Sequence, residues 1–322
     1  MSVLRFVLRK LAYGAAITLG VSVLTFAMLE LAPGEFYDDL KLDATVGTHT
    51  IETLRQEHGL TAAAPIRYGQ WLGAVVRGDF GRSLAHRAPV APLLWERMRN
   101  TLILTVPALL VAWLTALPLG LWTARHRGRF VDRLCSGATS GLLAVPDLLI
   151  GLAMLLIALK SGLFPAGGMF SPGSADSDLA SRIRDFARHA VLPLCAIVLS
   201  TLPAILRHVR ASAIDAGQAP AVRAARGHGI RGWRLDVRYV LTIAANPLIS
   251  LAGLSFAALL SASLLIEVVM SWPGLGPLLV EALLARDVHV VLGATMLATV
   301  FLVGGNLLAD LALLAMDPRI RV

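Results

Sequence analysis

Residues 101–123 read TLILTVPALLVAWLTALPLGLWT and contain no charged side chain. A helix needs about 20 apolar residues to cross the roughly 30 Å hydrocarbon core of a bilayer, and this stretch reaches that length. Its apolar character is continuous, without the alternation of a membrane-spanning β-strand, so it predicts a helix. The stretch therefore indicates an integral membrane protein.

Five more apolar runs have a similar length. The first is longer than the roughly 7 to 15 residues of a secretory signal core and lacks a clear small-x-small cleavage site, so we expect it to remain as a membrane span. Together the six runs predict an all-α integral membrane protein with six transmembrane helices. The other five runs are residues 11–29, 135–159, 190–206, 242–266 and 290–309, the last continuing past Asp310 to Met316.

The composition excludes several other classes of protein. Of the 322 residues, 56% are hydrophobic and 16% are charged, whereas soluble domains have about 25% charged residues. Cys135 and Cys195 lie too far apart in the sequence for a Cys-x-x-Cys metal or redox site. No lysine follows a glycine in the order of a phosphate-binding loop, and zinc or serine hydrolase motifs are missing. The chain is therefore not expected to hydrolyse ATP or to be an enzyme.

The placement of arginine predicts which loops face the cytoplasm. Residues 124–134 carry four arginines against Asp132, and residues 207–239 carry seven against Asp215 and Asp236. Because cytoplasmic loops are enriched in Lys and Arg, both segments are predicted to be cytoplasmic. With six spans, both termini then also lie in the cytoplasm.

This topology divides the chain into four parts. Residues 1–32 form the cytoplasmic N terminus and first span, 99–316 a five-helix core with a cytoplasmic loop at 207–245, and 317–322 a cytoplasmic tail. Residues 33–98 are predicted to form an extracytoplasmic helical subdomain, because apolar residues recur at helical spacing over 50–60 and again through Tyr68, Trp71 and Val75. The alternative is a disordered loop, which would leave Trp71 exposed.

Asp147 is the one carboxylate near the centre of an apolar run, where an ionisable group is costly. It follows Pro146, whose ring interrupts helical hydrogen bonding. Two interpretations stay open: a carboxylate of the translocation path or gate, or one that hydrogen-bonds a neighbouring helix or water. Asp147 is thus a possible path residue, and neither catalytic nor metal-binding residues are predicted.

The spans themselves offer no energy source for transport. An ion-driven carrier normally has several ionisable groups near the bilayer midplane and repeated halves. Here no lysine or histidine occupies the centre of a run, while Gly253 and five prolines have the simpler role of shaping helix packing. Energy for transport is therefore expected from another protein.

The cytoplasmic segment between the fourth and fifth runs is the most specific part of the sequence. Residues 217–241 read GQAPAVRAARGHGIRGWRLDVRYVL. Residues 219–226 favour a short helix with Gly227 and Gly229 as candidate terminators, and residues 233–241 favour a second short helix. We predict a compact knob of two helices. Its charges are also compatible with a purely topogenic role or with contact to anionic lipid.

Residues 222–230, VRAARGHGI, resemble the cytoplasmic EAA loop of binding-protein-dependent ABC importer permeases, in the form of the oligopeptide, dipeptide and nickel branch. Residues 267–276, EVVMSWPGLG, resemble that branch's segment after the fifth span, and residues 310–321 resemble its tail. Three upstream motifs also fit: GDFGRS at 78–83, RNTL at 99–102 and PLGLWTARHR at 118–127. The resemblance covers essentially the whole chain.

The resemblance implies a type I ABC importer permease fold in a bacterial inner (plasma) membrane. It implies transport of peptides or a related small solute, with nickel, glutathione or oligosaccharide as alternatives. The residues that it assigns to ATPase coupling are Val222, Arg223, Ala225, Arg226, His228 and Gly229. Pro220 and Ala221 stand where the family commonly has an acidic and an aromatic residue, and His228 replaces its usual lysine. The contact with the ATPase is therefore expected to differ.

The same resemblance implies the partners. They are a second homologous permease, expected to be a different chain, two cytoplasmic ABC ATPase subunits, an extracytoplasmic solute-binding protein and membrane lipid, without nucleic acid. ATP and magnesium would bind to the ATPases, so no cofactor is expected on this chain. The remote alternatives are an intramembrane enzyme using Asp147 and an ion-coupled carrier, but a membrane aspartyl protease needs two neighbouring carboxylates.

Overall fold

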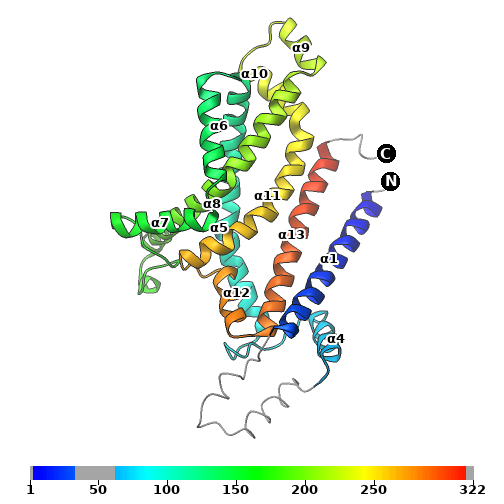
Figure 1. The fold of residues 1–322 in the computed structure, drawn as a ribbon, viewed down its shortest axis with the longest axis vertical. Helices are drawn as coiled ribbons and strands as arrows, with labels where there is room; N and C mark the ends of the chain where they lie inside the picture. Colours follow the sequence, from blue (N-terminus) through cyan, green and yellow to red (C-terminus); the bar gives the residue numbers. More distant parts are fainter. Residues whose placement is uncertain (1–2, 33–61, 317–322) are drawn as a thin grey trace. The chain divides into compact units, whose positions relative to one another are not determined.

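The computed structural model describes residues 3–32 and 62–316. Within these ranges every regular element is a helix, apart from one isolated β-bridge between Arg82 and Pro89 (Figure 1). Five of the described helices are long and apolar enough to cross a membrane, or six if a bent pair counts as one span. The predicted all-α membrane class is therefore confirmed.

Each predicted apolar run falls on a helix or a pair of helices. The described helices are α1 (Val3–Leu31), α4 (Ala64–Val75), α5 (Val90–Arg125), α6 (Phe130–Leu143), α7 (Asp147–Ser161), η1 (Ser174–Asp176), α8 (Leu179–Gly217), α9 (Pro220–Gly227), α10 (Trp233–Leu235), η2 (Asp236–Val240), α11 (Leu241–Val269), α12 (Leu275–Leu284) and α13 (Val288–Met316).

The third run departs from the predicted continuous helix. α6 ends at Leu143, α7 begins at Asp147, and the two are bent by 97°. Pro146 caps α7 with an extended backbone, φ −59° and ψ 142°, because its ring and its missing N–H prevent it from continuing the helix. Asp147 consequently begins a helix and does not lie in the middle of one.

Two other boundaries also shift. α8 has 39 residues, about 58 Å at 1.5 Å per residue, which is nearly twice the hydrocarbon thickness. The first part of the predicted loop 207–245 is therefore the last three turns of α8. α5 begins at Val90, inside the segment expected to form the separate subdomain 33–98.

The chain forms two compact units. The first comprises residues 1–10, 100–273 and 302–322. One hydrophobic cluster in it joins α5, α8, α9 and α11, and a second joins α5, α7, α8 and α11 around the fully buried Trp272. Small residues permit close helix packing here: a Cβ at Gly120 would lie 2.5 Å from Cγ1 of Val209, and one at Gly253 2.7 Å from Cβ of Ala309. The packing role expected for Gly253 is thus confirmed.

The second unit comprises residues 11–99 and 274–301. In it α4 packs on α1 through Tyr68, whose hydroxyl lies 2.8 Å from Ser22 Oγ and whose ring lies 5.3 Å from that of Phe26. Trp71 is buried and donates to the carbonyl of Phe80. The helix expected through Tyr68 to Val75 is present, whereas the one expected over 50–60 lies outside the described residues.

Candidate functional site

The segment assigned to coupling folds as the short helix α9, Pro220–Gly227. Pro220 occupies the first turn, where its fixed φ suits the helix and no N–H is needed. The helix ends at Gly227, and Gly229, two residues further on, has φ +82°. The amide of Ile230 donates to Ala225 at 3.0 Å and that of Gly229 to Arg226 at 3.0 Å, the paired bonds of a Schellman cap. Gly229 is therefore the terminator that the sequence predicted.

The six predicted coupling residues fall on two faces of this segment. Val222 is fully buried and Ala225 is 5% exposed, both within the hydrophobic cluster that joins α9 to α5, α8 and α11. Arg223, Arg226 and His228 are exposed, as is Gly229. Val222 and Ala225 thus anchor the helix, and the arginines and His228 form its exposed face.

The expected second short helix over 233–241 is wrong as a separate element. α10, the π-helical turn η2 and α11 follow one another without a break from Trp233 to Val269. Leu235, Val240, Ala244 and Leu248 are all buried. In a regular α-helix, residues on one buried face lie three or four positions apart, but Leu235 and Val240 are five apart. The π-helical turn between them accommodates the extra residue, so both side chains can be buried. The chain after α9 is therefore joined directly to a membrane-length helix.

Two ion pairs bind the arginine-rich ends of the helices together. Asp132 of α6 accepts from Arg210 of α8 at 2.6 and 2.9 Å and from the amide of Gly128 at 2.8 Å. Asp236 of η2 pairs with Arg125 at the end of α5. Both carboxylates are buried. The sequence signal for these contacts was present, since each acid lies within an arginine-rich segment, but their partners could not be read from it.

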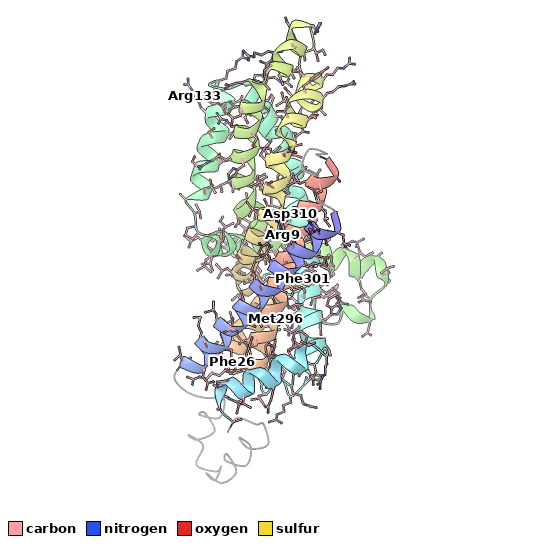
Figure 2. All side chains as sticks on the ribbon, turned by 90° about the vertical axis from the view of Figure 1, so that its right-hand side faces the viewer. Arg9, Phe26, Arg133, Met296, Phe301 and Asp310 are labelled. Carbon is pink, nitrogen blue, oxygen red and sulfur yellow. The ribbon has the colours of Figure 1, made fainter. Side chains whose placement is uncertain are left out.

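A third ion pair lies on the long terminal helices. Lys10 Nζ of α1 lies 2.7 Å from Asp310 of α13. Figure 2 labels Asp310 and Arg9, the residue before Lys10 in the chain. Both side chains are partly exposed, so the ion pair contributes only a modest stabilising energy. The ion pair gives a partner to Asp310, one of the few carboxylates near the end of an apolar run.

Asp147 lies at the first position of α7, directly after the break at Pro146, and is half-buried. Its side chain makes no hydrogen bond or ion pair with any residue in the described ranges. A carboxylate at a helix N-terminus is favoured by the positive end of the helix dipole, which gives Asp147 a local role. A role in the translocation path stays a prediction.

Two of the family-like motifs contact each other directly. The Trp272 indole N–H donates to the Asn100 carbonyl at 2.9 Å, and Asn100 Nδ2 donates to the Pro273 carbonyl at 2.9 Å. Trp272 is completely buried and lies edge-on to Phe186 at 6.0 Å. The segments 99–102 and 267–276 therefore form one clasp, which the sequence singled out as two separate motifs.

A similar contact uses the motif at 78–83. Ser83 Oγ donates to Asp287 Oδ2 at 2.6 Å, and the amide of Ala85 donates to the same oxygen at 3.1 Å. Asp287 also accepts from the amide of Val290 at 3.3 Å, which caps the start of α13. Ser83 and Asp287 are both buried, so this motif has a structural role.

Comparison with known proteins adds to this geometry. The family model described as the binding-protein-dependent transport system inner membrane component matches residues 116–322, a range that includes α9 and the Trp272 segment. The oligopeptide transport system permease protein AppB of Bacillus subtilis (strain 168) is 28% identical over 98% of this chain and 98% of its own. The dipeptide transport system permease protein DppB of Escherichia coli (strain K12) is 30% identical over 99% of each.

Among solved structures, the inward-facing MetNI methionine ABC transporter is similar in fold. The TM-score is 0.54 at 16% sequence identity, and the match covers 70% of this chain and 96% of that chain. At this level of identity the similarity concerns the arrangement of helices alone.

Proposed function

Because the chain belongs to the family of binding-protein-dependent transport system inner membrane components, we propose that it is the permease subunit of an ABC importer for peptides. Two relatives that are similar over nearly their whole length are named as oligopeptide and dipeptide permeases. On this proposal the chain encloses half of a translocation path, and a second permease, a different chain, encloses the other half. An extracytoplasmic binding protein delivers the solute.

The observation that carries the proposal is the geometry of α9. Its apolar side, Val222 and Ala225, is buried against the membrane helices, while Arg223, Arg226 and His228 face outward. A helix seated in an ATPase groove by its outer face would transmit movement through its buried face. Two cytoplasmic ATPases, which bind ATP and magnesium themselves, would drive this movement, and this chain would carry no cofactor and no catalytic residue.

The contacts around α9 suit a rigid lever. After α9, the chain passes through the Schellman cap and a turn into the unbroken stretch of α10, η2 and α11. Asp236 of η2 also forms an ion pair with Arg125 of α5. Displacement of α9 would therefore move α5 and α11 together, and switching between access states needs such stiff elements. On this proposal the arginine-rich ends of the helices, and both termini, lie in the cytoplasm.

The test is a charge reversal on the outer face of α9. Arg223→Glu combined with Arg226→Glu should leave the subunit in the membrane but reduce ATPase co-purification and peptide uptake together. The matched control is Arg129→Glu with Arg133→Glu, which reverses two exposed charges on α6 and its cap. Wild-type ATPase binding and uptake in the α9 variant, or equal losses in both variants, would remove the coupling role from α9.

The peptide assignment has its own test, because solute choice lies with the binding protein. The binding protein that delivers solute to this permease is purified without ligand exchange, and its bound solute is identified by mass spectrometry. Peptides of two or more residues are expected. If the only bound solute is glutathione, a nickel chelate or an oligosaccharide, the peptide assignment is wrong, but the proposal of an ATPase-coupled permease is unaffected.

A further inference from the structure

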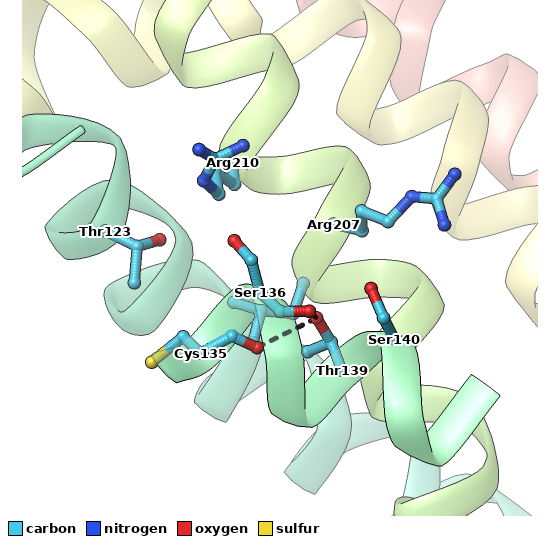
Figure 3. A pocket seen from close by; sticks show the side chains of 8 residues that line it. Thr123, Cys135, Ser136, Thr139, Ser140, Arg207 and Arg210 are labelled. Atoms are coloured by element: carbon cyan, nitrogen blue, oxygen red, sulfur yellow. Dashed lines mark hydrogen bonds between the residues drawn. The ribbon is translucent and has the colours of Figure 1, made fainter. Parts of the chain in front are cut away.

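A small polar cavity lies among α5, α6 and α8 in the first compact unit (Figure 3). Its volume is about 230 Å³, below the roughly 300–1,000 Å³ of pockets that hold drug-sized ligands. Four hydroxyl side chains and two guanidinium groups line it: Thr123, Ser136, Thr139, Ser140, Arg207 and Arg210. Neither the exposed face of α9 nor Asp147 takes part in it, so the cavity is distinct from the proposed docking face and from the possible path residue.

The cavity lies at a definite depth, which the sequence gives directly. Thr123 is the last residue of one uncharged apolar run, Leu206 the last of another and Cys135 the first of a third, and all three line the cavity. Three membrane runs therefore end at its wall, on the arginine-rich side. This is the depth of lipid headgroups, where basic pockets between transmembrane helices bind anionic lipids.

One of the two arginines is available for a ligand and the other is not. Arg210 is engaged with Asp132, so the pair contributes no net charge. Arg207 is exposed and makes no ion pair or hydrogen bond within the described ranges, which leaves one positive charge. In Figure 3 its side chain extends from α8 on the side of Ser140 and points away from Arg210. The cavity thus has the charge of a monoanion site.

The hydroxyl groups divide in the same way. Thr123 and Thr139 donate to backbone carbonyls of their own helices, at 2.8 and 2.9 Å. Ser136 and Ser140 have no such side-chain bond within the described residues, so their O–H groups remain donors. A guanidinium and two hydroxyl donors around one small cavity match the acceptor oxygens of a phosphate group.

The apolar surface next to the cavity favours a lipid over a free anion. Leu143 lies three residues beyond Ser140 on the same face of α6, one turn farther along the apolar run, and is 40% exposed. Exposed apolar side chains on a membrane-length run face acyl chains.

We propose that this cavity binds the phosphate of an anionic phospholipid, with the headgroup held by Arg207, Ser136 and Ser140 and an acyl chain along α6 past Leu143. The lipid would belong to the cytoplasmic leaflet, because the proposed function puts the arginine-rich ends of the helices on that side. Only this choice of leaflet rests on the proposed function. The phosphodiester of a singly charged lipid such as phosphatidylglycerol matches the single unpaired guanidinium. A zwitterionic lipid brings an additional cation that Arg207 repels.

The test compares lipid binding by the assembled transporter in two variants of equal charge. Arg207→Gln removes the cavity charge, and Arg133→Gln removes an exposed arginine of α6 that does not line the cavity and is labelled in Figure 2. Native mass spectrometry counts phosphatidylglycerol retained after delipidation and titration. Arg207→Gln should bind it roughly fivefold more weakly, since one basic group near an anionic surface contributes about that factor. Arg133→Gln should match wild type.

Cys135 supplies an independent readout, because it is one of the residues that line the cavity. In a Cys195→Ala background, phosphatidylglycerol should slow alkylation of Cys135, whereas phosphatidylcholine or inorganic phosphate should not. Ser140→Leu places a larger apolar side chain in the cavity and keeps Arg207, so it should also reduce the amount of retained lipid. This variant replaces Arg207→Gln in the test if Arg207→Gln fails to assemble. Equal lipid retention by wild type and both cavity variants would overturn the site, and protection by inorganic phosphate alone would replace the lipid with a free anion.

Discussion

At the scale of single residues, Gly229 carries the sharpest prediction. It has φ +82° at the end of α9 with open space around its Cα, so a side chain there is opposed by the backbone and not by a clash. Gly229→Ala should destabilise the last turn of α9 by roughly 1–2 kcal/mol, which raises amide exchange of Ile230 about 5- to 30-fold. Hydrogen exchange of the purified complex measures this.

Gly227→Ala is the matched control for that experiment. Gly227 is helical, has a negative φ and would meet nothing within 4 Å, so alanine should stabilise the helix slightly. Equal exchange in both variants would show that the left-handed position is unimportant for α9.

Asp147 gives a second prediction at this scale. Its side chain begins α7, and asparagine is also accepted at a helix N-terminus, so Asp147→Asn should lose only the charge–dipole attraction of about 0.3–1 kcal/mol. We expect peptide uptake close to wild type, as for Asp215→Asn on the exposed face of α8. Loss of uptake with normal membrane assembly in Asp147→Asn alone would make this carboxylate a residue of the translocation path.

At the scale of elements, the Trp272–Asn100 clasp holds the end of α11 to α5. Trp272→Phe keeps the aromatic packing on Phe186 but leaves the buried Asn100 carbonyl without its indole donor. The cost should be about 1–3 kcal/mol, seen as a lower unfolding temperature of the purified subunit. Trp95→Phe, at a site that is 63% exposed, should change stability by less than about 0.5 kcal/mol. A smaller effect at Trp272 than at Trp95 would contradict this role.

Elements were predictable where one physical rule dominated. The continuous apolar runs predicted the five long helices, and Gly229, after residues 219–226, predicted where α9 terminates. Pro146 was recognised as a residue that can kink a helix, but the 97° break into two separate helices there was not predicted, because a proline can either kink a helix or end it. The fusion of α10, η2 and α11 was missed because burial of Leu235 and Val240 through a π-helical turn depends on tertiary packing.

The candidate site was predictable as a segment and less so as a surface. The motif at 222–230 located α9, but only the structure separates the buried Val222 and Ala225 from the exposed arginines. The pairs Asp132–Arg210 and Asp236–Arg125 join residues far apart in sequence. A single sequence shows the charges of such pairs but not which of them meet.

At the scale of the whole molecule, the proposed topology predicts which segments face each side of the membrane. Cysteines replacing His86 and Ala224, both exposed, should be labelled by an impermeant maleimide from opposite sides, His86 from outside. Ser83 would be a misleading site because it is 2% exposed and bonded to Asp287. Labelling of both cysteines from the same side of intact cells would refute the orientation and the coupling role of α9.

The central claim, that the outer face of α9 docks an ATPase, is tested most directly by photocrosslinking. A benzoylphenylalanine in place of the exposed Ala224 is activated in membranes that contain the whole importer and still take up peptide. We predict an adduct between this chain and the ATPase subunit, and no ATPase adduct from the same group at His86. Absence of an ATPase adduct at position 224 in a complex active in uptake would contradict the account.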